Sequence, residues 1–399
     1  MTDGPLAGVR VLDAATFIAA PFCGTILGDF GAQLIKVEQP GQGDSLRRFG
    51  TPAECGDTLV WLSEARNRQS VTLDLRQSEG AALFRQLAAQ SDVVLENFRP
   101  GTMEKWGLGY EDLAKDNPKL VMLRVSAYGQ TGPMREMPGF ARIAHAFSGL
   151  SFLAGEPGRT PVVPGSTSLA DYMTGMFGAI GVLLALRHAD RTGQGQVVDI
   201  ALYESIFRIL DELVPTYAKG GVVRERLGAD VAHVVPHSHY ETRDGEWVAL
   251  ACSNDRIWQR LAAAMGRPEL GSDPRFARAP DRTACRAEVN GIVATWVGSC
   301  SAPEVLAACE QVGAPCSKLL SIADFFGHPQ YEARGNMLRV DDPRQGELVL
   351  PAAVPRLSLT PAGFRNAGPA LGDCTRAILG ELLQLDSAAL DQLAARAII

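Results

Sequence analysis

Two histidines, His237 and His239, stand two residues apart in the segment VVPHSHYET, and this spacing would place both side chains on one face of a β-strand. A histidine pair can ligate a metal, but the segment does not complete a recognisable ligand set. We therefore expect these residues to contact a substrate or to serve the fold. The eight cysteines are scattered, without a CxxC pair or a Cys/His cluster, so a zinc site is not expected.

Several common nucleotide and hydrolase motifs are absent. The chain has no GxGxxG after its first expected strand, no GxxxxGK[ST], no GxSxG and no HExxH. The first strand is instead followed by AATFIAAP, which lacks the glycines that let a backbone approach a pyrophosphate. These absences argue against an NAD-dependent enzyme and against a serine hydrolase of the nucleophile-elbow type.

Short apolar segments alternate with helical segments through the first third of the chain. We expect strands at 9–15, 33–38, 92–98 and 120–128, and helices at 21–30 and 79–90. The strands have the β-branched, apolar character of a parallel sheet that is buried on both faces. This alternation predicts an α/β fold with right-handed crossovers, in which ligands bind beyond the carboxyl ends of the strands.

The organisation changes in the middle of the chain. A long apolar helix is expected over 171–187, and its most apolar part, Gly175 to Leu186, is too short to span a bilayer. Asp244 and Gly245 mark the turn of a hairpin over 240–251. Further helices are expected at 255–265, 284–297 and 374–385. We place a smaller α+β domain at 225–325, between two parts of a large domain at 1–224 and 326–399.

Composition limits the function classes. The chain has 399 residues, 46% of them hydrophobic and 21% charged, which is typical of a globular protein and excludes a disordered chain or a coiled coil. The formal net charge of −7 argues against a nucleic-acid protein with a strongly basic surface. The first residues, MTDGPLAGVR, do not resemble a signal peptide, and we expect a reduced, cytoplasmic protein.

Several longer segments follow one another in a specific order: GDFGAQLIKVE, LENFRPG, SAYGQTGP, LADYMTG and RTGQGQVVDIALYES, with GPALGDCTRAILGELL near the end. In this order they resemble the class III CoA-transferases, a family that includes formyl-CoA and carnitine CoA-transferases. The resemblance runs nearly end to end. It implies a Rossmann-like large domain built from both chain ends, a small inserted domain, and an interlocked homodimer.

The resemblance also implies that Asp171, in LADYMTG at the start of a helix, is the nucleophile. A carboxylate can attack a thioester carbonyl to form a mixed anhydride, and the released CoA thiolate can then form an aspartyl-CoA thioester. Without the resemblance, Asp171 would be interpreted as a charge that stabilises a helix N-terminus by about 0.3–1 kcal/mol. The two interpretations are compatible, because a helix N-terminus offers N–H groups to an oxyanion.

Family members hold CoA along the carboxyl ends of the first strands, and the matching positions here are Ile18, Ala19, Leu73 to Arg76, Asn97, Phe98, Lys105, Ser126, Ala127, Tyr128 and Gly129. Arg76 and Lys105 suit phosphate oxygens, and Phe98 suits adenine packing. Gln39 and Ile18 depart from the arginine and glutamine of the formyl-CoA enzymes, which argues against an oxalate/formate pair. CoA thioester is therefore expected as a substrate, with no permanently bound cofactor and no metal.

Two other activities remain open. The similar α-methylacyl-CoA racemases use an aspartate and a histidine on opposite faces of the carbon next to the thioester. Asp171 matches the aspartate, but Phe140 stands where the histidine is expected, and His145 follows five residues later. Racemase chemistry is the second hypothesis, and acyl-CoA hydrolysis, in which water reaches an Asp171 adduct, is the third.

The segment VVPHSHYETRDGEWVALAC resembles enzymes of the family that act on small dicarboxylates, of the succinyl-, citramalyl- and mesaconyl-CoA types. The free carboxylate of such an acid needs a pocket rich in cations or donors, which could come from His237, Ser238, His239, Arg47 and Arg142. The nearest likeness is to the mesaconyl-CoA C1–C4 transferases, which move CoA between two carboxylates of one acid. We therefore predict a CoA-transferase for small C4–C5 dicarboxylic acids, with no nucleic-acid or membrane partner.

Overall fold

The computed structural model describes residues 4–165 and 168–399, and its central element is a six-stranded parallel sheet. The strand order is β3-β2-β1-β4-β5-β6. The strands are β1 (Arg10–Asp13), β2 (Gln33–Glu38), β3 (Arg68–Thr72), β4 (Val93–Glu96), β5 (Val121–Ser126) and β6 (Val197–Ala201). This is the order of a doubly wound Rossmann-like sheet, so the predicted α/β class is confirmed.

The strand β3 was not among the strands predicted from the sequence. Its sequence RQSVT is polar, whereas a parallel strand buried on both faces is normally apolar. The polar groups are paired inside the protein: Nε of Arg68 lies 3.2 Å from Oδ2 of Asp13, and Oγ of Ser70 donates to Oε1 of Glu38 at 2.6 Å. Hydrophobic periodicity does not reveal a strand whose burial depends on ion pairs.

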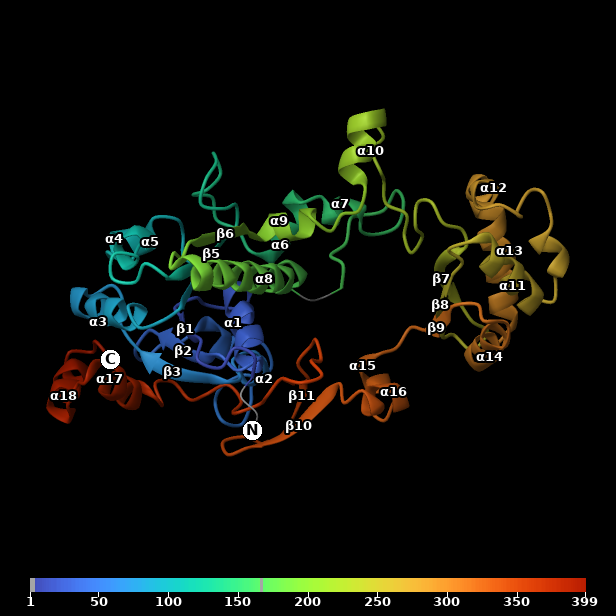
Figure 1. The fold of residues 1–399 in the computed structure, drawn as a ribbon. Helices are drawn as coiled ribbons and strands as arrows, with labels where there is room; N and C mark the ends of the chain where they lie inside the picture. The colour runs from blue at the N-terminus through green and yellow to red at the C-terminus, as the bar shows by residue number, and fades with distance from the viewer. Residues whose placement is uncertain (1–3, 166–167) are drawn as a thin grey trace. The chain divides into compact units, whose positions relative to one another are not determined.

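Helices cover both faces of the sheet (Figure 1). One face packs against α1 (Ala19–Asp29), α6 (Ala141–Phe147), α8 (Leu169–Thr192) and α9 (Leu202–Phe207). The other packs against α3 (Ser78–Ala88), α17 (Thr375–Leu383) and α18 (Ser387–Ala395). The last two helices come from the C-terminus, so both chain ends build this unit.

The long apolar helix α8 extends beyond the predicted range of 171–187 at both ends. Its 24 residues are long and apolar enough to cross a membrane, but the core helices of globular proteins often are as well. In this structure α8 packs on α1 and β5. The packing is close at Gly175, where a Cβ atom would lie 2.7 Å from the carbonyl oxygen of Ala19 and 2.9 Å from Cβ of Phe22. Glycine therefore lets the first turns of α8 and α1 approach each other.

Smaller elements complete the first unit, which comprises residues 1–150, 165–212 and 334–399. They are η1 (Ser45–Arg48), α2 (Leu59–Glu64), α4 (Thr102–Lys105), α5 (Tyr110–Leu113) and the antiparallel hairpin of β10 (Met337–Asp342) and β11 (Gly346–Pro351). The helix α7 (Leu150–Leu153) begins at the last residue of the first segment.

A second unit comprises residues 151–164 and 213–333. Its antiparallel sheet contains β7 (His237–Glu241), β8 (Trp247–Ala251) and β9 (Cys316–Lys318), and Gly245 forms the expected turn between β7 and β8 with a φ of 78°. Its helices are α10 (Leu213–Gly220), α11 (Asp255–Ala264), η2 (Pro268–Gly271), α12 (Ala279–Ala284), α13 (Arg286–Ser299), α14 (Ala302–Val312), α15 (Ile322–Phe325) and α16 (Pro329–Ala333). The domain predicted at 225–325 falls within this unit.

Candidate active site

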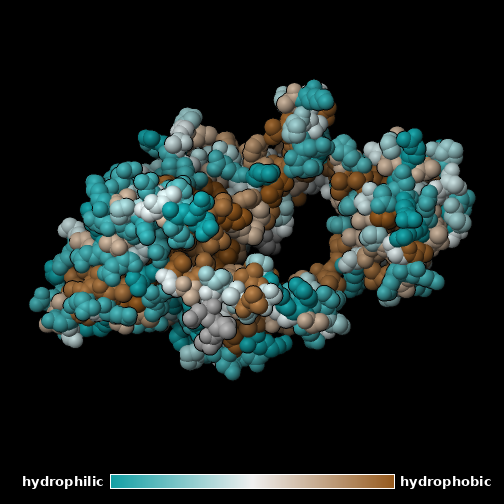
Figure 2. Space-filling model, in the orientation of Figure 1, coloured by the Kyte–Doolittle hydropathy of each residue, from teal (hydrophilic) through white to brown (hydrophobic). Residues whose placement is uncertain are grey.

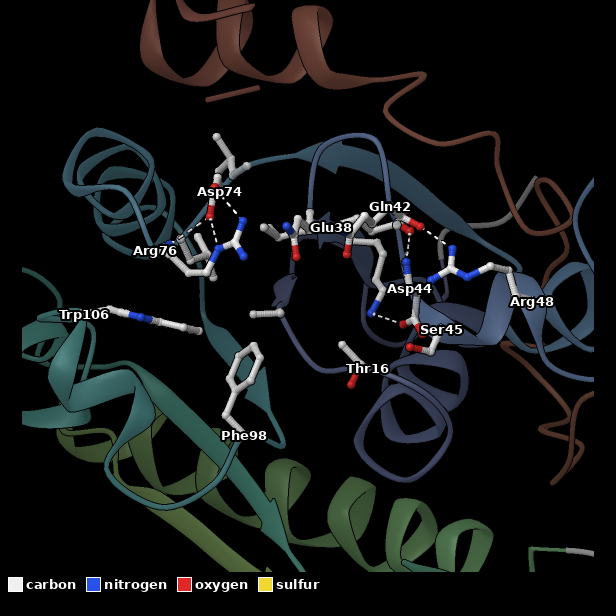
Figure 3. Close-up of a pocket in the computed structure, with 17 residues that line it drawn as sticks. Thr16, Glu38, Gln42, Asp44, Ser45, Arg48, Asp74, Arg76, Phe98 and Trp106 are labelled. Carbon is white, nitrogen blue, oxygen red and sulfur yellow. Dashed lines mark hydrogen bonds and ion pairs between the residues drawn. The ribbon is translucent and has the colours of Figure 1, made fainter. Parts of the chain in front are cut away.

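A cavity of about 220 Å³, here called the sheet-edge pocket, opens at the carboxyl ends of β1, β2, β3 and β4 (Figure 3). Parallel doubly wound sheets bind ligands at this edge. Figure 3 shows Arg76 and Trp106 on one side of the pocket and Arg48 on the other. The lining residues are Ala14, Thr16, Lys36, Val37, Glu38, Gln39, Gln42, Gly43, Asp44, Ser45, Arg48, Leu73, Asp74, Leu75, Arg76, Phe98 and Trp106.

The floor of the pocket is a buried ion-pair cluster. Nζ of Lys36 lies 3.0 Å from Oδ2 of Asp44 and 3.7 Å from Oδ1 of Asp13, and all three side chains are almost fully buried. Burial alone would lower the pKa of Lys36, but the charges of Asp13, Asp44 and Glu38 raise it above its usual value. Lys36 is therefore a protonated structural cation and not a nucleophile.

Five of the predicted CoA-binding residues, Leu73 to Arg76 and Phe98, line the sheet-edge pocket. The Arg76 guanidinium donates two hydrogen bonds to Asp74, at 2.8 and 2.9 Å, and these bonds lower the pKa of Asp74 to about 2. The ring of Phe98 packs edge-on against Trp106, with centroids 5.1 Å apart. An exposed guanidinium beside two aromatic rings is suited to a phosphorylated, base-containing ligand.

The loop after β1 lies at the edge where a parallel sheet is expected to bind ligands, and it contributes further residues to the site. Thr16 lines the pocket, and its backbone is held by Asn97, whose side chain accepts from the Thr16 N–H at 2.8 Å and donates to its carbonyl at 2.7 Å. Phe17 has a φ of 69°, and its N–H donates to Oδ1 of Asp44 at 3.0 Å. A strained non-glycine residue held by two elements is typical of a functional loop. No sequence pattern distinguishes this phenylalanine.

Lys105 and the loop after β5 lie elsewhere along the same edge. Lys105 lines a separate cavity of about 580 Å³, together with Arg99, Arg124 and Gln130. In the predicted segment from Ser126 to Gly129, the Ser126 hydroxyl accepts from the Gly129 N–H at 2.9 Å, with Ala127 and Tyr128 between them. The Tyr128 ring packs edge-on against Phe147 of α6. Among the predicted CoA-binding residues, Lys105 therefore lines this second cavity, whereas the segment from Ser126 to Gly129 is in the lining of neither cavity.

Asp171 lies in the first turn of α8 with 9% of its surface exposed. Burial raises the pKa of its carboxyl to about 6, opposed by a hydrogen bond with the Ser168 side chain. Among the ion pairs of the described residues, none involves Asp171. A buried carboxylate without a cation is poorly solvated, which favours its reaction with an electrophile.

Contacts connect Asp171 with the loop that borders the sheet-edge pocket. The next residue, Tyr172, packs against a cluster that contains Phe17 and Ile18, and its ring meets Phe22 edge-on at 4.8 Å. The predicted residues Ile18 and Ala19 are the N-cap and first residue of α1, and both are buried. The segment from Thr16 to Ala19 therefore leads from the pocket toward the turn that carries Asp171.

The histidine that a racemase would need is not at the expected place. Phe140 is the N-cap of α6 and is 73% exposed. His145 is 2% exposed, and its Nε2 atom accepts a hydrogen bond from the Ala170 N–H at 3.0 Å. The lone pair of this imidazole is thus already bonded to the backbone of α8.

The residues predicted to bind the free carboxylate of the acid lie in different surroundings. Arg47 is 5% exposed, and its guanidinium bonds to Glu38 and Asp57, which are contacts of a structural ion pair. Arg142 is exposed on α6. His237, Ser238 and His239 belong to β7 of the second unit, where the two histidines alternate with Ser238.

The described part of the chain does not contain a group of three or more His, Cys, Asp or Glu side chains arranged to hold a metal ion. All eight cysteines are unpaired.

Comparisons with known proteins agree with the geometry. The family description "CoA-transferase family III" matches residues 6–375. The chain is 54% identical to the succinyl-CoA–L-malate CoA-transferase beta subunit of Chloroflexus aurantiacus, covering 100% of this chain and 99% of that one. It is 43% identical to the succinyl-CoA–D-citramalate CoA-transferase of the same organism, covering 99% and 98%.

A solved structure shows the same fold. A CaiB/BaiF family protein from Brucella suis superposes with a TM-score of 0.83 at 32% identity, over 96% of this chain and 100% of that one. Together with the match over residues 6–375, this confirms the resemblance found in the sequence. The protein is an enzyme that transfers CoA, and it belongs to CoA-transferase family III.

Proposed function

We propose that the enzyme transfers CoA from succinyl-CoA to a small C4–C5 dicarboxylic acid, with Asp171 as the covalent carrier. The relatives that are 54% and 43% identical are named for succinyl-CoA with L-malate and with D-citramalate. The observation that carries the proposal within this chain is the buried carboxylate of Asp171, whose pKa is raised to about 6 without a cationic partner among the described residues.

The proposed reaction has four steps, and in each of them one acyl bond forms as another breaks. The Asp171 carboxylate attacks the thioester carbonyl, the C–S bond breaks, and a mixed anhydride and CoA thiolate form. The thiolate then attacks the Asp171 carbonyl and releases succinate, which leaves an aspartyl-CoA thioester. The carboxylate of the acceptor acid attacks the carbonyl of this thioester, the C–S bond breaks, and a second anhydride and CoA thiolate form. The thiolate finally attacks the acceptor carbonyl of the anhydride, which forms the new acyl-CoA and releases the Asp171 carboxylate.

The position of Asp171 supports each of these steps. At neutral pH a carboxyl with a pKa of about 6 is mostly ionised, so it can act as a nucleophile. The N-terminal turn of α8 directs backbone N–H groups toward negative charge, and this would stabilise the oxyanion of each tetrahedral intermediate. Low exposure also limits access of water, which favours transfer over hydrolysis.

The sheet-edge pocket would hold only part of CoA, because its volume of about 220 Å³ is smaller than such a ligand needs. We assign the adenine end to this pocket, near Phe98, Trp106 and Arg76. The loop from Thr16 to Ala19 would then guide the pantetheine arm toward Asp171.

The free carboxylate of the acid is proposed to bind His237, Ser238 or His239, with Arg142 as a further cation. Arg47 is a weaker candidate, because its guanidinium already bonds to Glu38, Asp57 and the carbonyl of Pro369. A more specific proposal within this class is C1–C4 transfer in mesaconyl-CoA, in which the donor and acceptor carboxylates belong to one molecule.

We also propose that the enzyme is a cytoplasmic, interlocked homodimer. One side of α8 exposes apolar side chains, including Ile180 at 54% exposure and Leu184 at 68%. A second copy of the chain that packs on this side would bury them. Figure 2 shows hydrophobic surface over α8. Light scattering of the purified protein would test the dimer by its mass.

The decisive experiment compares Asp171→Ala with Asp190→Ala, a matched control because Asp190 is exposed at the other end of α8. CoA transfer from succinyl-CoA to malate, citramalate and mesaconate is followed by mass spectrometry. We expect Asp171→Ala to fold and lose essentially all transfer, and Asp190→Ala to match the wild type. Hydroxylamine should convert Asp171 of the wild type to a hydroxamate after incubation with succinyl-CoA alone.

Near-normal transfer by Asp171→Ala would overturn the proposed mechanism. Transfer restricted to monocarboxylates such as formate would overturn the substrate class. Rapid CoA release without an acceptor acid would identify a hydrolase, and proton exchange at the carbon next to the thioester would identify a racemase.

A further inference from the structure

His145 lies directly beneath the turn of α8 that carries Asp171. Its imidazole is 2% exposed, and Nε2 accepts the N–H of Ala170 at 3.0 Å. Ala170 is itself fully buried and precedes Asp171 in the chain.

The hydrogen bond to Ala170 serves as a helix cap. The first N–H groups of an α-helix have no partner within the helix and need one from elsewhere. Ser168, the N-cap residue of α8, makes no side-chain bond to these groups, and its side chain interacts with the Asp171 carboxyl instead. His145, 25 residues earlier, supplies the missing acceptor.

Only one protonation state of His145 fits this arrangement. Because Nε2 accepts, the ring is neutral and its proton is on Nδ1. An imidazolium could not accept the Ala170 N–H, and its charge would oppose the positive end of the helix dipole. Burial and the nearby charge of Arg142 both lower the pKa of His145, in agreement with a neutral ring.

The second nitrogen, Nδ1, is buried and has no hydrogen-bond partner among the residues that the structure describes. An unpaired buried donor costs free energy, so packing alone does not explain the choice of histidine here. A leucine would fill a similar space without this cost, but it would leave the Ala170 N–H without an acceptor.

We propose that His145 is a positioning residue for the nucleophile: its neutral imidazole fixes the first turn of α8 through Ala170 and so sets where the Asp171 carboxylate meets the thioester. The proposal rests on the assignment of Asp171 as covalent carrier. Covalent catalysis depends on near-attack geometry, and a misplacement of about 1 Å can cost about 10²-fold in rate. His145 makes no contact with the reacting atoms in this proposal.

The test compares His145→Leu, which removes the acceptor, with His145→Gln, whose side-chain carbonyl can accept the same N–H. His188→Leu is the control, because His188 is exposed farther along α8. We expect His145→Leu to lower kcat about 10- to 100-fold with an unchanged KM for succinyl-CoA, by the geometric argument above. His145→Gln should restore kcat to within about threefold of the wild type, and His188→Leu should match it.

A second measurement is made on the wild-type protein and needs only the conservative His145→Gln variant to fold, for assignment of the signal. The chain has six histidines, so ¹⁵N-labelled histidine gives few signals, and the one missing in His145→Gln identifies His145. We expect the Nδ1-protonated neutral tautomer at pH 7. A signal from an Nε2-protonated ring or an imidazolium would overturn the proposal.

The kinetic outcomes separate this inference from the proposed function. If Asp171→Ala is inactive while folded His145→Leu keeps the wild-type kcat, the positioning role is wrong and the nucleophile stands. Equal losses in His145→Leu and His145→Gln would also overturn the role, because the acceptor would then not matter. If Asp171→Ala stays active, the nucleophile assignment itself fails.

Discussion

Glu38 and Asp171 are both buried carboxyl groups of the same α/β unit, but their surroundings are opposite. Glu38 is 4% exposed and receives two hydrogen bonds from Arg47, each at 2.8 Å. Burial raises the pKa of Glu38, but the hydrogen bonds and charge of Arg47 outweigh it, so the pKa is lower than usual. Asp171 is 9% exposed without an ion pair among the described residues, and its pKa is raised. Burial with a cation stabilises charge for the fold, whereas burial without one keeps charge available for reaction.

The largest change in stability is expected when the buried ion pair between Arg47 and Glu38 is broken. Arg47 bonds to Glu38 and Asp57 and lies over Trp61 at 3.8 Å, so Arg47→Met would leave Glu38 buried and unpaired. We expect a loss of about 3–5 kcal/mol in the free energy of unfolding, the usual cost of removing one partner of a buried pair. Urea unfolding at pH 7.5 measures it.

The control for this change is Arg339→Met. Arg339 pairs with Glu347 at 3.2 Å, but both side chains are more than half exposed, and such pairs contribute at most about 1 kcal/mol. Similar losses in the two variants would mean that burial of the Glu38 pair has no particular energetic role.

Removing the charge of Asp171 is expected to raise the stability of the fold. Since the pKa of about 6 in the folded protein lies above the usual value of 3.8 for an aspartate, the folded protein binds more protons than the unfolded chain between these values, and its stability falls as pH rises through this window. Asp171→Asn removes the buried charge and should stabilise the fold by about 1–3 kcal/mol at pH 7.5. Thermal unfolding at several pH values should show the gain shrinking below pH 6 and vanishing near pH 4. A gain that does not depend on pH would contradict the assigned cause.

The same raised pKa predicts the acid limb of activity. Only the ionised carboxyl of Asp171 can attack, so transfer should fall about tenfold per pH unit below a pH of about 6. Values of kcat/KM for succinyl-CoA between pH 5 and 8 measure this limb, because they report ionisation of the free enzyme, and Asp190→Ala should show the same profile. A rate that stays constant down to pH 5 would indicate that Asp171 is solvated more than its burial suggests.

The comparison also explains what could be predicted from the sequence. The strands at β1, β2, β4 and β5 and the helix α8 follow from apolar periodicity, because their burial depends on hydrophobic contacts. The strand β3 did not, because its burial depends on a partner distant in sequence: Asp13 lies 55 residues from Arg68. Ion pairs between distant segments leave no periodic signal.

The candidate site was predictable to the same extent. Asp171 and several pocket residues followed from the resemblance, since each lies in a segment shared with the family. The strained φ of Phe17 and the bond from His145 to Ala170 did not, because both arise from tertiary packing of the β1–α1 loop and of α6 on α8. The role of a side chain that hydrogen-bonds to the backbone of another element can be recognised only from the three-dimensional structure.

The smallest effect is expected at the exposed rim of the sheet-edge pocket. Arg76 pairs with Asp74, but its side chain is 58% exposed, so solvent and salt screen its attraction for a phosphate. Arg76→Ala should raise the KM for succinyl-CoA about two- to fivefold at low salt, less at high salt, and leave kcat unchanged. Arg376→Ala, which removes an exposed guanidinium paired with Asp391, is the control. A lower kcat in Arg76→Ala would contradict this assignment, because it would mean that Arg76 affects the reacting end of the substrate. Binding by the sheet-edge pocket and reaction at Asp171 could then not be treated as separate functions.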